Sequence, residues 1–117
     1  MSIIYIDPKP LKGRMRNREE LLGIWISLNA SRDIVKAALE RDSYDFVWTD
    51  SQHAPLNEER IVEFCSMIGE TGLEVVFRIK HTKQTYLIGN YLDLGLAGIE
   101  VPQVDLESTV DDAVKKF

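Results

Sequence analysis

Apolar residues along the chain fall into short continuous runs that alternate with longer amphipathic segments. The runs are rich in β-branched and aromatic side chains, which is typical of buried strands. The segments between them carry apolar residues at intervals of three and four, which is typical of helices. The pattern therefore predicts four consecutive strand–helix units, with strands at residues 22–28, 44–49, 74–79 and 97–101.

Polar and glycine residues mark where the helices begin and end. We expect Asn29 or Ser31 to cap the first helix and Asn57 the second, because such side chains accept hydrogen bonds from first-turn N–H groups. Gly72 and Gly95 are expected to end the second and third helices. The last three helices are predicted at about residues 58–70, 83–94 and 106–117.

Strands that alternate with helices predict a parallel sheet covered by helices, and so an α/β fold. Two architectures fit, an open doubly wound sheet or part of a (β/α)₈ TIM barrel. No Gly-x-Gly-x-x-Gly or Walker A loop follows a strand, so the nucleotide-binding open sheet lacks its signature.

A whole barrel needs about 250 residues. The chain of 117 residues is therefore predicted to be a partial barrel of about four βα units, the N-terminal half. Its open sheet edges would have to be completed by a longer chain or a second copy.

The whole chain, residues 1–117, is expected to form one domain, with residues 1–20 as a polar lead-in. The net charge of −5 disfavours nucleic acid and anionic membranes as partners, because both bind basic surfaces. Cys65 is the single cysteine, which favours a reducing compartment. Residues 1–6 are too short for a signal peptide, and no apolar stretch approaches the roughly 20 residues of a membrane span. These features predict a cytoplasmic protein.

Polar residues follow the second, third and fourth predicted strands. Because parallel strands end at a common rim, residues at these ends should gather there, as in a barrel active site. Asp50 precedes His53 by three residues, which suggests an oriented general base, although a surface histidine fits the same spacing. The other residues at these strand ends are Gln52, Arg78, Lys80, His81, Pro102, Gln103 and Asp105. Ordinary loop polarity is the favoured interpretation of Lys80, Gln103 and Asp105, and His81 is expected to face solvent.

Arg78 interrupts an otherwise apolar strand. An arginine in that position needs an anionic partner, because an unpaired buried charge is costly. The partner could be a substrate carboxylate or enolate, or it could be Asp50 in a purely structural salt bridge, and the sequence leaves both open. The spacing of histidines, cysteines and glutamates predicts no metal ligands in this chain.

Five motifs together resemble the HpcH/HpaI aldolase family, the metal-dependent (class II) pyruvate aldolases with a (β/α)₈ barrel. The likeness runs from about residue 22 to residue 117, with the motifs in the family's order. They are GIW at residues 23–25, DFVWTDSQHAP at 45–55, VVFR at 75–78, LDLG at 92–95 and VPQVD at 101–105.

The resemblance implies a role for each matching position. His53 would be the proton acceptor, and Arg78 would hold the carboxylate or enolate of pyruvate. Asp50 would orient the histidine, and Gln52 and Pro102 would contact the substrate beside Arg78. The family has a glutamate where this chain has Gln52, which removes a negative charge next to the base.

Asp93 matches a family residue that raises the basicity of the histidine. It lies at the end of the third predicted helix, across the layer from the rim. It could therefore reach His53 only from a neighbouring subunit, and solvation of a helix end is the competing interpretation.

The resemblance also implies cofactors and partners. A divalent metal (Mg²⁺, Mn²⁺ or Co²⁺) would bind in the complete barrel, through a glutamate and an aspartate that lie beyond residue 117. A small 2-oxo acid is the expected substrate, and a homo-oligomer is expected.

The resulting hypothesis is a carbon–carbon lyase that cleaves or forms a 4-hydroxy-2-oxo acid, giving pyruvate and an aldehyde. This chain alone would be inactive if the metal ligands are indispensable. One alternative is a non-catalytic half-barrel that binds a 2-oxo acid or a partner subunit. Another is a different lyase or decarboxylase of the same superfamily, citrate-lyase-like or macrophomate-synthase-like.

Overall fold

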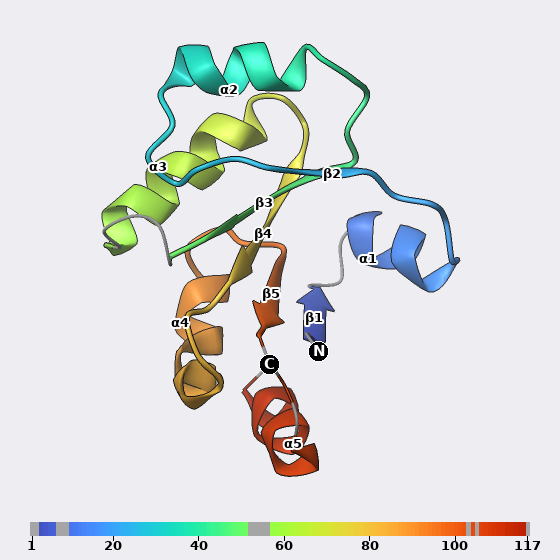
Figure 1. Cartoon of the computed structure of the whole chain (residues 1–117), viewed down its shortest axis with the longest axis vertical. Helices are drawn as coiled ribbons and strands as arrows, with labels where there is room; N and C mark the ends of the chain where they lie inside the picture. Colours follow the sequence, from blue (N-terminus) through green and yellow to red (C-terminus); the bar gives the residue numbers. More distant parts are fainter. Residues whose placement is uncertain (1–2, 7–9, 52–56, 103, 105, 117) are drawn as a thin grey trace.

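The computed structural model describes residues 3–6, 10–51, 57–102, 104 and 106–116. Strands and helices alternate along almost all of this length (Figure 1). The strands are β1 Ile3–Ile6, β2 Gly23–Trp25, β3 Phe46–Asp50, β4 Glu74–Arg78 and β5 Gly98–Val101. The helices are α1 Pro10–Arg16, α2 Arg32–Leu39, α3 Glu58–Gly69, the 3₁₀-helix η1 Thr82–Leu87, α4 Ile88–Leu92 and α5 Glu107–Lys115.

The strands form one sheet in the order β1-β5-β4-β3-β2, and the pairs from β2 to β5 are all parallel. Consecutive parallel strands that are neighbours, joined by right-handed crossovers, place their helices on one face of the sheet. A doubly wound sheet instead reverses its strand order at a switch point. The predicted α/β class and the four parallel strands are therefore confirmed, and the strand order is that of a barrel.

The two faces of the sheet differ sharply. On β4, Val75 and Phe77 are buried in the core, and the Phe77 ring packs edge-on against Tyr91 of α4, with 5.2 Å between centroids. Because side chains alternate along a strand, Glu74 and Arg78 belong to the opposite face. We call that opposite face the inner face.

The predicted helix boundaries are largely confirmed. The Ser31 hydroxyl accepts a hydrogen bond from the Ile34 N–H at 3.3 Å, and Asn57 Oδ1 accepts one from the Arg60 N–H at 2.7 Å. Gly72 and Gly95 follow their helices with φ of 82° and 109°, a region that favours glycine.

The third predicted helix is not one continuous α-helix. It opens as the 3₁₀-helix η1, a common form for the first turns of a helix. His81 precedes this first turn, and its Nδ1 accepts a hydrogen bond from the Lys83 N–H at 3.0 Å. This exposed histidine caps the turn.

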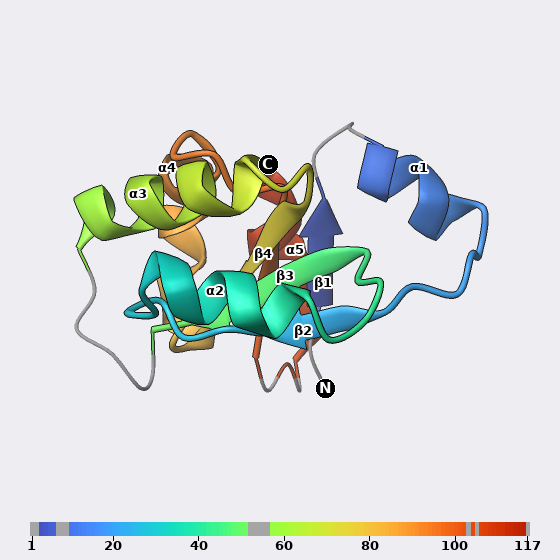
Figure 2. The ribbon, with the colours of Figure 1, turned by 90° about the horizontal axis from the view of Figure 1, so that it is seen from above.

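The pattern predicts no secondary structure in the lead-in, yet β1 and α1 form there. β1 pairs antiparallel with β5, from Ile3 opposite Val101 to Ile6 opposite Gly98. Figures 1 and 2 both place α1 on the opposite side of the sheet from α3 and α4. β1 thereby covers an edge of β5 that would otherwise expose backbone hydrogen-bonding groups.

Within the part of the chain that the structure describes, no helix has the length and apolar character needed to cross a membrane.

Candidate active site at the carboxyl ends of the strands

Asp50 and Arg78 are neighbours in register at the carboxyl ends of β3 and β4. Arg78 Nη2 donates to Asp50 Oδ2 at 2.8 Å. The Asp50 side chain is 2% exposed and that of Arg78 is 23% exposed. The salt bridge that the sequence left open therefore forms. It does not exclude a substrate role, because a guanidinium has five N–H donors.

Trp48 packs beside this ion pair. The Arg78 guanidinium carbon lies 5.3 Å from the centroid of the Trp48 ring, within the range of a cation–π contact. Trp48 in turn packs edge-on against Trp25, with 6.5 Å between ring centroids. The guanidinium is thus fixed by a carboxylate and by an aromatic face, which holds it at the rim.

Sequence reasoning missed Trp48 and Trp25 as parts of this site. The available signal was the two-residue period of a strand, which puts Trp48 on the same face as Asp50. The pairing of Trp25 with Trp48 follows only from the register between β2 and β3.

Glu100 is a further residue that sequence reasoning missed. It lies next to Arg78 in the register between β4 and β5. Its neighbours Ile99 and Val101 are fully buried in the core, so alternation places Glu100 on the inner face with Arg78. The signal was the same as for Arg78, a charged residue inside an apolar strand.

Arg60 fastens the loop that follows β2. Its Nε donates to the Leu28 carbonyl at 2.6 Å and its Nη2 to the Ala30 carbonyl at 2.8 Å. The backbone N–H of the same residue is held by the Asn57 cap. One side chain therefore ties this rim loop to the first turn of α3.

The remaining predicted site residues are placed only in part. Pro102 is buried directly after β5, at the rim. Lys80 is exposed, and its backbone N–H donates to Gln84 Oε1. The predictions for Gln52, His53, Gln103 and Asp105 fall outside the described residues.

Asp93 is the exposed residue that ends α4. A helix that connects two parallel strands ends near the amino end of the second strand. Asp93 therefore lies near the amino end of β5, whereas Arg78 lies at the carboxyl end of β4. The roles of Asp93 and His53 stay predictions.

No group of three or more histidine, cysteine, aspartate and glutamate side chains that could hold a metal ion occurs among the described residues. Asp50, the best-placed carboxylate, is already engaged by Arg78. The described side chains therefore do not by themselves form the ligand set of a divalent cation.

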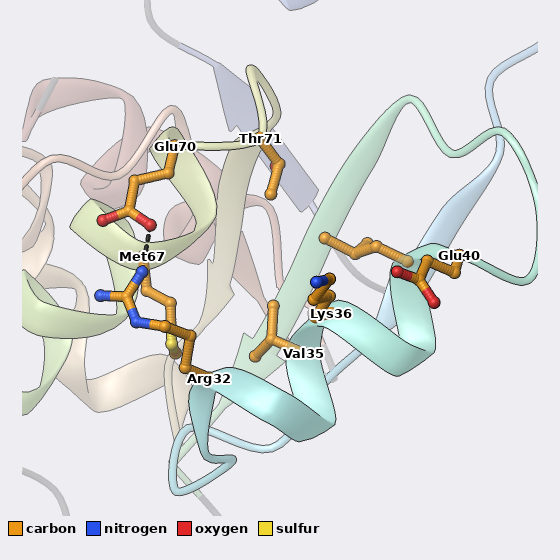
Figure 3. Close-up of a pocket in the computed structure, with 8 residues that line it drawn as sticks. Arg32, Val35, Lys36, Glu40, Met67, Glu70 and Thr71 are labelled. Atoms are coloured by element: carbon orange, nitrogen blue, oxygen red, sulfur yellow. Dashed lines mark hydrogen bonds and ion pairs between the residues drawn. The ribbon is translucent and has the colours of Figure 1, made fainter.

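A separate groove of about 390 Å³ lies between α2 and α3, in the helical layer (Figure 3). Apolar side chains, among them Val35 and Met67, line it. Arg32 and Glu70 form an ion pair across it. It contains none of the residues that the sequence assigns to chemistry, so we place the candidate site at the rim.

The fold and this rim define the class of protein: a TIM-barrel-like α/β structure with a charged cluster at the strand ends. No family model matches the chain. A hydroxypyruvate/pyruvate aldolase of Paraburkholderia phytofirmans is 27% identical over 108 residues, which cover 91% of this chain and 40% of the relative.

Two solved structures have the same fold. An HpcH/HpaI aldolase from Desulfitobacterium hafniense matches with a TM-score of 0.73 and 25% identity, covering 89% of this chain and 39% of the other. The citrate synthase SbnG matches with a TM-score of 0.73 and 26% identity, covering 90% and 42%. The resemblance to the HpcH/HpaI aldolases is therefore confirmed in sequence and in fold, and the chain spans about two-fifths of these relatives.

Proposed function

We propose that the chain belongs to a carbon–carbon lyase that cleaves a 4-hydroxy-2-oxo acid into pyruvate, or a close 2-oxo acid, and an aldehyde. It supplies the general base, His53, and an arginine, Arg78, that binds the anionic substrate; we call this arginine the anion clamp. The observation that carries the proposal is Arg78, fixed at the rim between Asp50 and Trp48. An arginine so placed can stabilise the negative charge of a carboxylate and of an enolate. The likeness to aldolases supports the same class of reaction.

In this proposal His53 accepts the proton of the C4 hydroxyl while the bond between C3 and C4 breaks. The C4–O bond becomes the carbonyl of the aldehyde, and the electron pair stays on the pyruvate fragment as an enolate. The enolate then takes up a proton at C3. Arg78 stabilises the charge that develops on this fragment, so it acts most strongly in the transition state.

The other assigned residues support these two. Asp50 holds Arg78 and orients the histidine, while Gln52 and Pro102 contact the substrate. Asp93 can act on His53 only from a neighbouring subunit, so its proposed role requires a homo-oligomer.

The resemblance implies a divalent metal, which would act as a Lewis acid on the 2-oxo acid when bound. The described residues do not assemble its ligands. We therefore assign the metal to the rest of a complete barrel and give no metal-dependent step to this chain.

The test compares the chain with a form extended through the downstream reading frame. Both are incubated with a 4-hydroxy-2-oxo acid and Mg²⁺, Mn²⁺ or Co²⁺, and pyruvate is measured. We expect pyruvate from the extended form, with loss of activity in His53→Ala and Arg78→Ala. The control Lys115→Ala, at an exposed position on α5, should change little. Full activity of Arg78→Ala would refute the clamp.

A second candidate is supported by the equal TM-score of the citrate synthase SbnG. The same clamp would then hold a 2-oxo acid for carbon–carbon bond formation, or would bind it without turnover. Condensation without cleavage, or binding of pyruvate when neither the chain nor its extended form reacts, would favour this candidate over the aldolase.

A further inference from the structure

Three charged residues lie side by side on the inner face at the rim. Asp50, Arg78 and Glu100 occupy one row across β3, β4 and β5, because Asp50 is in register with Arg78 and Arg78 with Glu100. Two carboxylates therefore flank one guanidinium. The row has a net negative charge, although Arg78 alone would attract an anion.

Glu100 differs from Asp50 in its surroundings. Asp50 accepts a hydrogen bond from Arg78, whereas the carboxylate of Glu100 has no hydrogen bond or ion pair within the described ranges. Glu100 is partly buried in a strand whose flanking residues are core. A carboxylate in such a place lowers the stability of the sheet unless something donates to it.

A ligand held by Arg78 would meet this carboxylate. Neighbouring strands lie about 4.8 Å apart, so side chains from β4 and β5 can contact two ends of one three-carbon molecule. A methyl group beside Glu100 would leave the carboxylate desolvated and unpaired, whereas a hydroxyl would donate to it. The difference between the two ligands is thus one charge-assisted hydrogen bond.

We propose that Glu100 is a specificity-determining residue that favours 2-oxo acids with a hydroxyl on carbon 3 over those with a methyl group there. This inference rests on the proposed function, since Arg78 must bind the 2-oxo acid first. The competing explanation is that Glu100 only balances the charge of Arg78. In that case its removal would change stability but not the choice of ligand.

Calorimetric titration of the 117-residue chain with hydroxypyruvate and with pyruvate tests the proposal. We expect the wild type to bind hydroxypyruvate about tenfold more tightly, the effect of one charge-assisted hydrogen bond. Glu100→Leu should bring this ratio to about one, and pyruvate should bind at least as well as before because a repelling charge is gone. Glu100→Gln has nearly the same shape and should give an intermediate ratio. Glu107→Gln, an exposed site on α5, should leave the ratio unchanged.

The outcomes separate the two claims. A wild-type ratio near one, or a ratio that survives in both Glu100 variants, overturns the role of Glu100 while pyruvate binding through Arg78 still stands. Failure of the wild type to bind either ligand, or equal pyruvate binding by Arg78→Met, overturns the proposed function and this inference with it. Near-ultraviolet circular dichroism of each variant checks its fold, and the isosteric Glu100→Gln keeps the test decisive if Glu100→Leu does not fold.

Discussion

Strand β3 is flanked by two aspartate–arginine pairs with nearly equal distances between their charged atoms and with different surroundings. At the amino end, Arg14 Nη2 lies 2.7 Å from Asp45 Oδ1, and at the carboxyl end Arg78 Nη2 lies 2.8 Å from Asp50 Oδ2. The side chains of Arg14 and Asp45 are 39% and 22% exposed, whereas that of Asp50 is 2% exposed. We call the amino end of the strands the base.

At the base, both members of the pair, Asp45 and Arg14, make further contacts with other groups of the protein. Asp45 also accepts from the Leu22 N–H at 2.8 Å, and Arg14 also contacts Glu19. The pKa of Asp45 is lowered, first by the hydrogen bond from Leu22 and then by Arg14. These contacts fasten α1 and the start of β2 to the sheet.

The pair at the rim has a different neighbourhood. Its arginine contacts an aromatic face and stands in a row with Glu100. In barrels of this kind, residues at the carboxyl ends of strands perform chemistry and those at the amino ends contribute stability. The comparison teaches that the same pair of residues can stand in different surroundings at the two ends of one strand. At the amino end the pair is engaged by groups of the protein itself, and at the rim we propose that it binds substrate.

The largest expected effect on stability comes from Asp50→Ala. It leaves the largely enclosed Arg78 without its carboxylate, and breaking a buried ion pair costs about 3 kcal/mol. Asp45→Ala at the base should cost less, because water can replace the lost contacts. Urea denaturation of both variants measures the difference. A larger loss of unfolding free energy in Asp45→Ala than in Asp50→Ala would contradict the difference between rim and base.

The next effect is expected for Arg60→Met, which removes both donors from the Leu28 and Ala30 carbonyls. We expect a loss of about 2 kcal/mol, since carbonyls at a partly enclosed site lose their partners. Hydrogen exchange in the loop after β2 should accelerate. The matched control Glu63→Gln removes only the charge of the outer partner of Arg60, which lies 3.3 Å from Nη1, and should change little. Unchanged exchange in Arg60→Met would show that the loop is held by other contacts.

Gly23→Ala probes packing at the base. A Cβ at Gly23 would come within 2.4 to 2.8 Å of ring atoms of Phe46, so the ring must move. Overpacking of this kind should cost about 1–2 kcal/mol. Gly13→Ala in α1 is the matched control, because nothing lies within 4 Å of its added Cβ and alanine favours a helix. The measurement is the free energy of unfolding, and a stabilised Gly23→Ala would contradict the packing.

The smallest effect is expected for Asp45→Asn and depends on pH. A carboxyl whose pKa is lowered in the folded state stabilises the protein above its unfolded pKa, and that stability is lost as the pH falls through the folded pKa. Wild type should therefore melt above the variant at pH 7. The gap should begin to close as the pH falls below the ordinary value of 3.8, and should close as it falls through the lower pKa of the folded state. Thermal unfolding at several pH values measures the gap. A gap that widens on acidification would contradict the assignment.

Local signals in the sequence predict most of this fold. Apolar runs mark β2 to β5, and Ser31, Asn57, Gly72 and Gly95 mark helix ends, because each acts on residues close to it in sequence. The run at residues 3–6 carries the same signal, although the pattern there is interpreted as a polar lead-in. Its antiparallel pairing with β5, near the other end of the chain, is not encoded by local signals.

The site was predictable only as a set of alternatives. The sequence singled out Arg78 because a charge inside an apolar strand is unusual, and Asp50 because it follows a strand and precedes His53 by three residues. It could not decide whether the two side chains meet. Their contact, and the addition of Trp48 and Glu100, depend on the register between separate strands, which no single strand encodes.

The most direct test of the account is the binding of pyruvate to two matched variants, Arg78→Met at the rim and Arg14→Met at the base. Each removes one guanidinium from an aspartate beside the same strand. We predict that calorimetric titration will find binding abolished in Arg78→Met and unchanged in Arg14→Met. Equal binding by both variants, or loss in Arg14→Met alone, would contradict the claim that the rim holds the substrate.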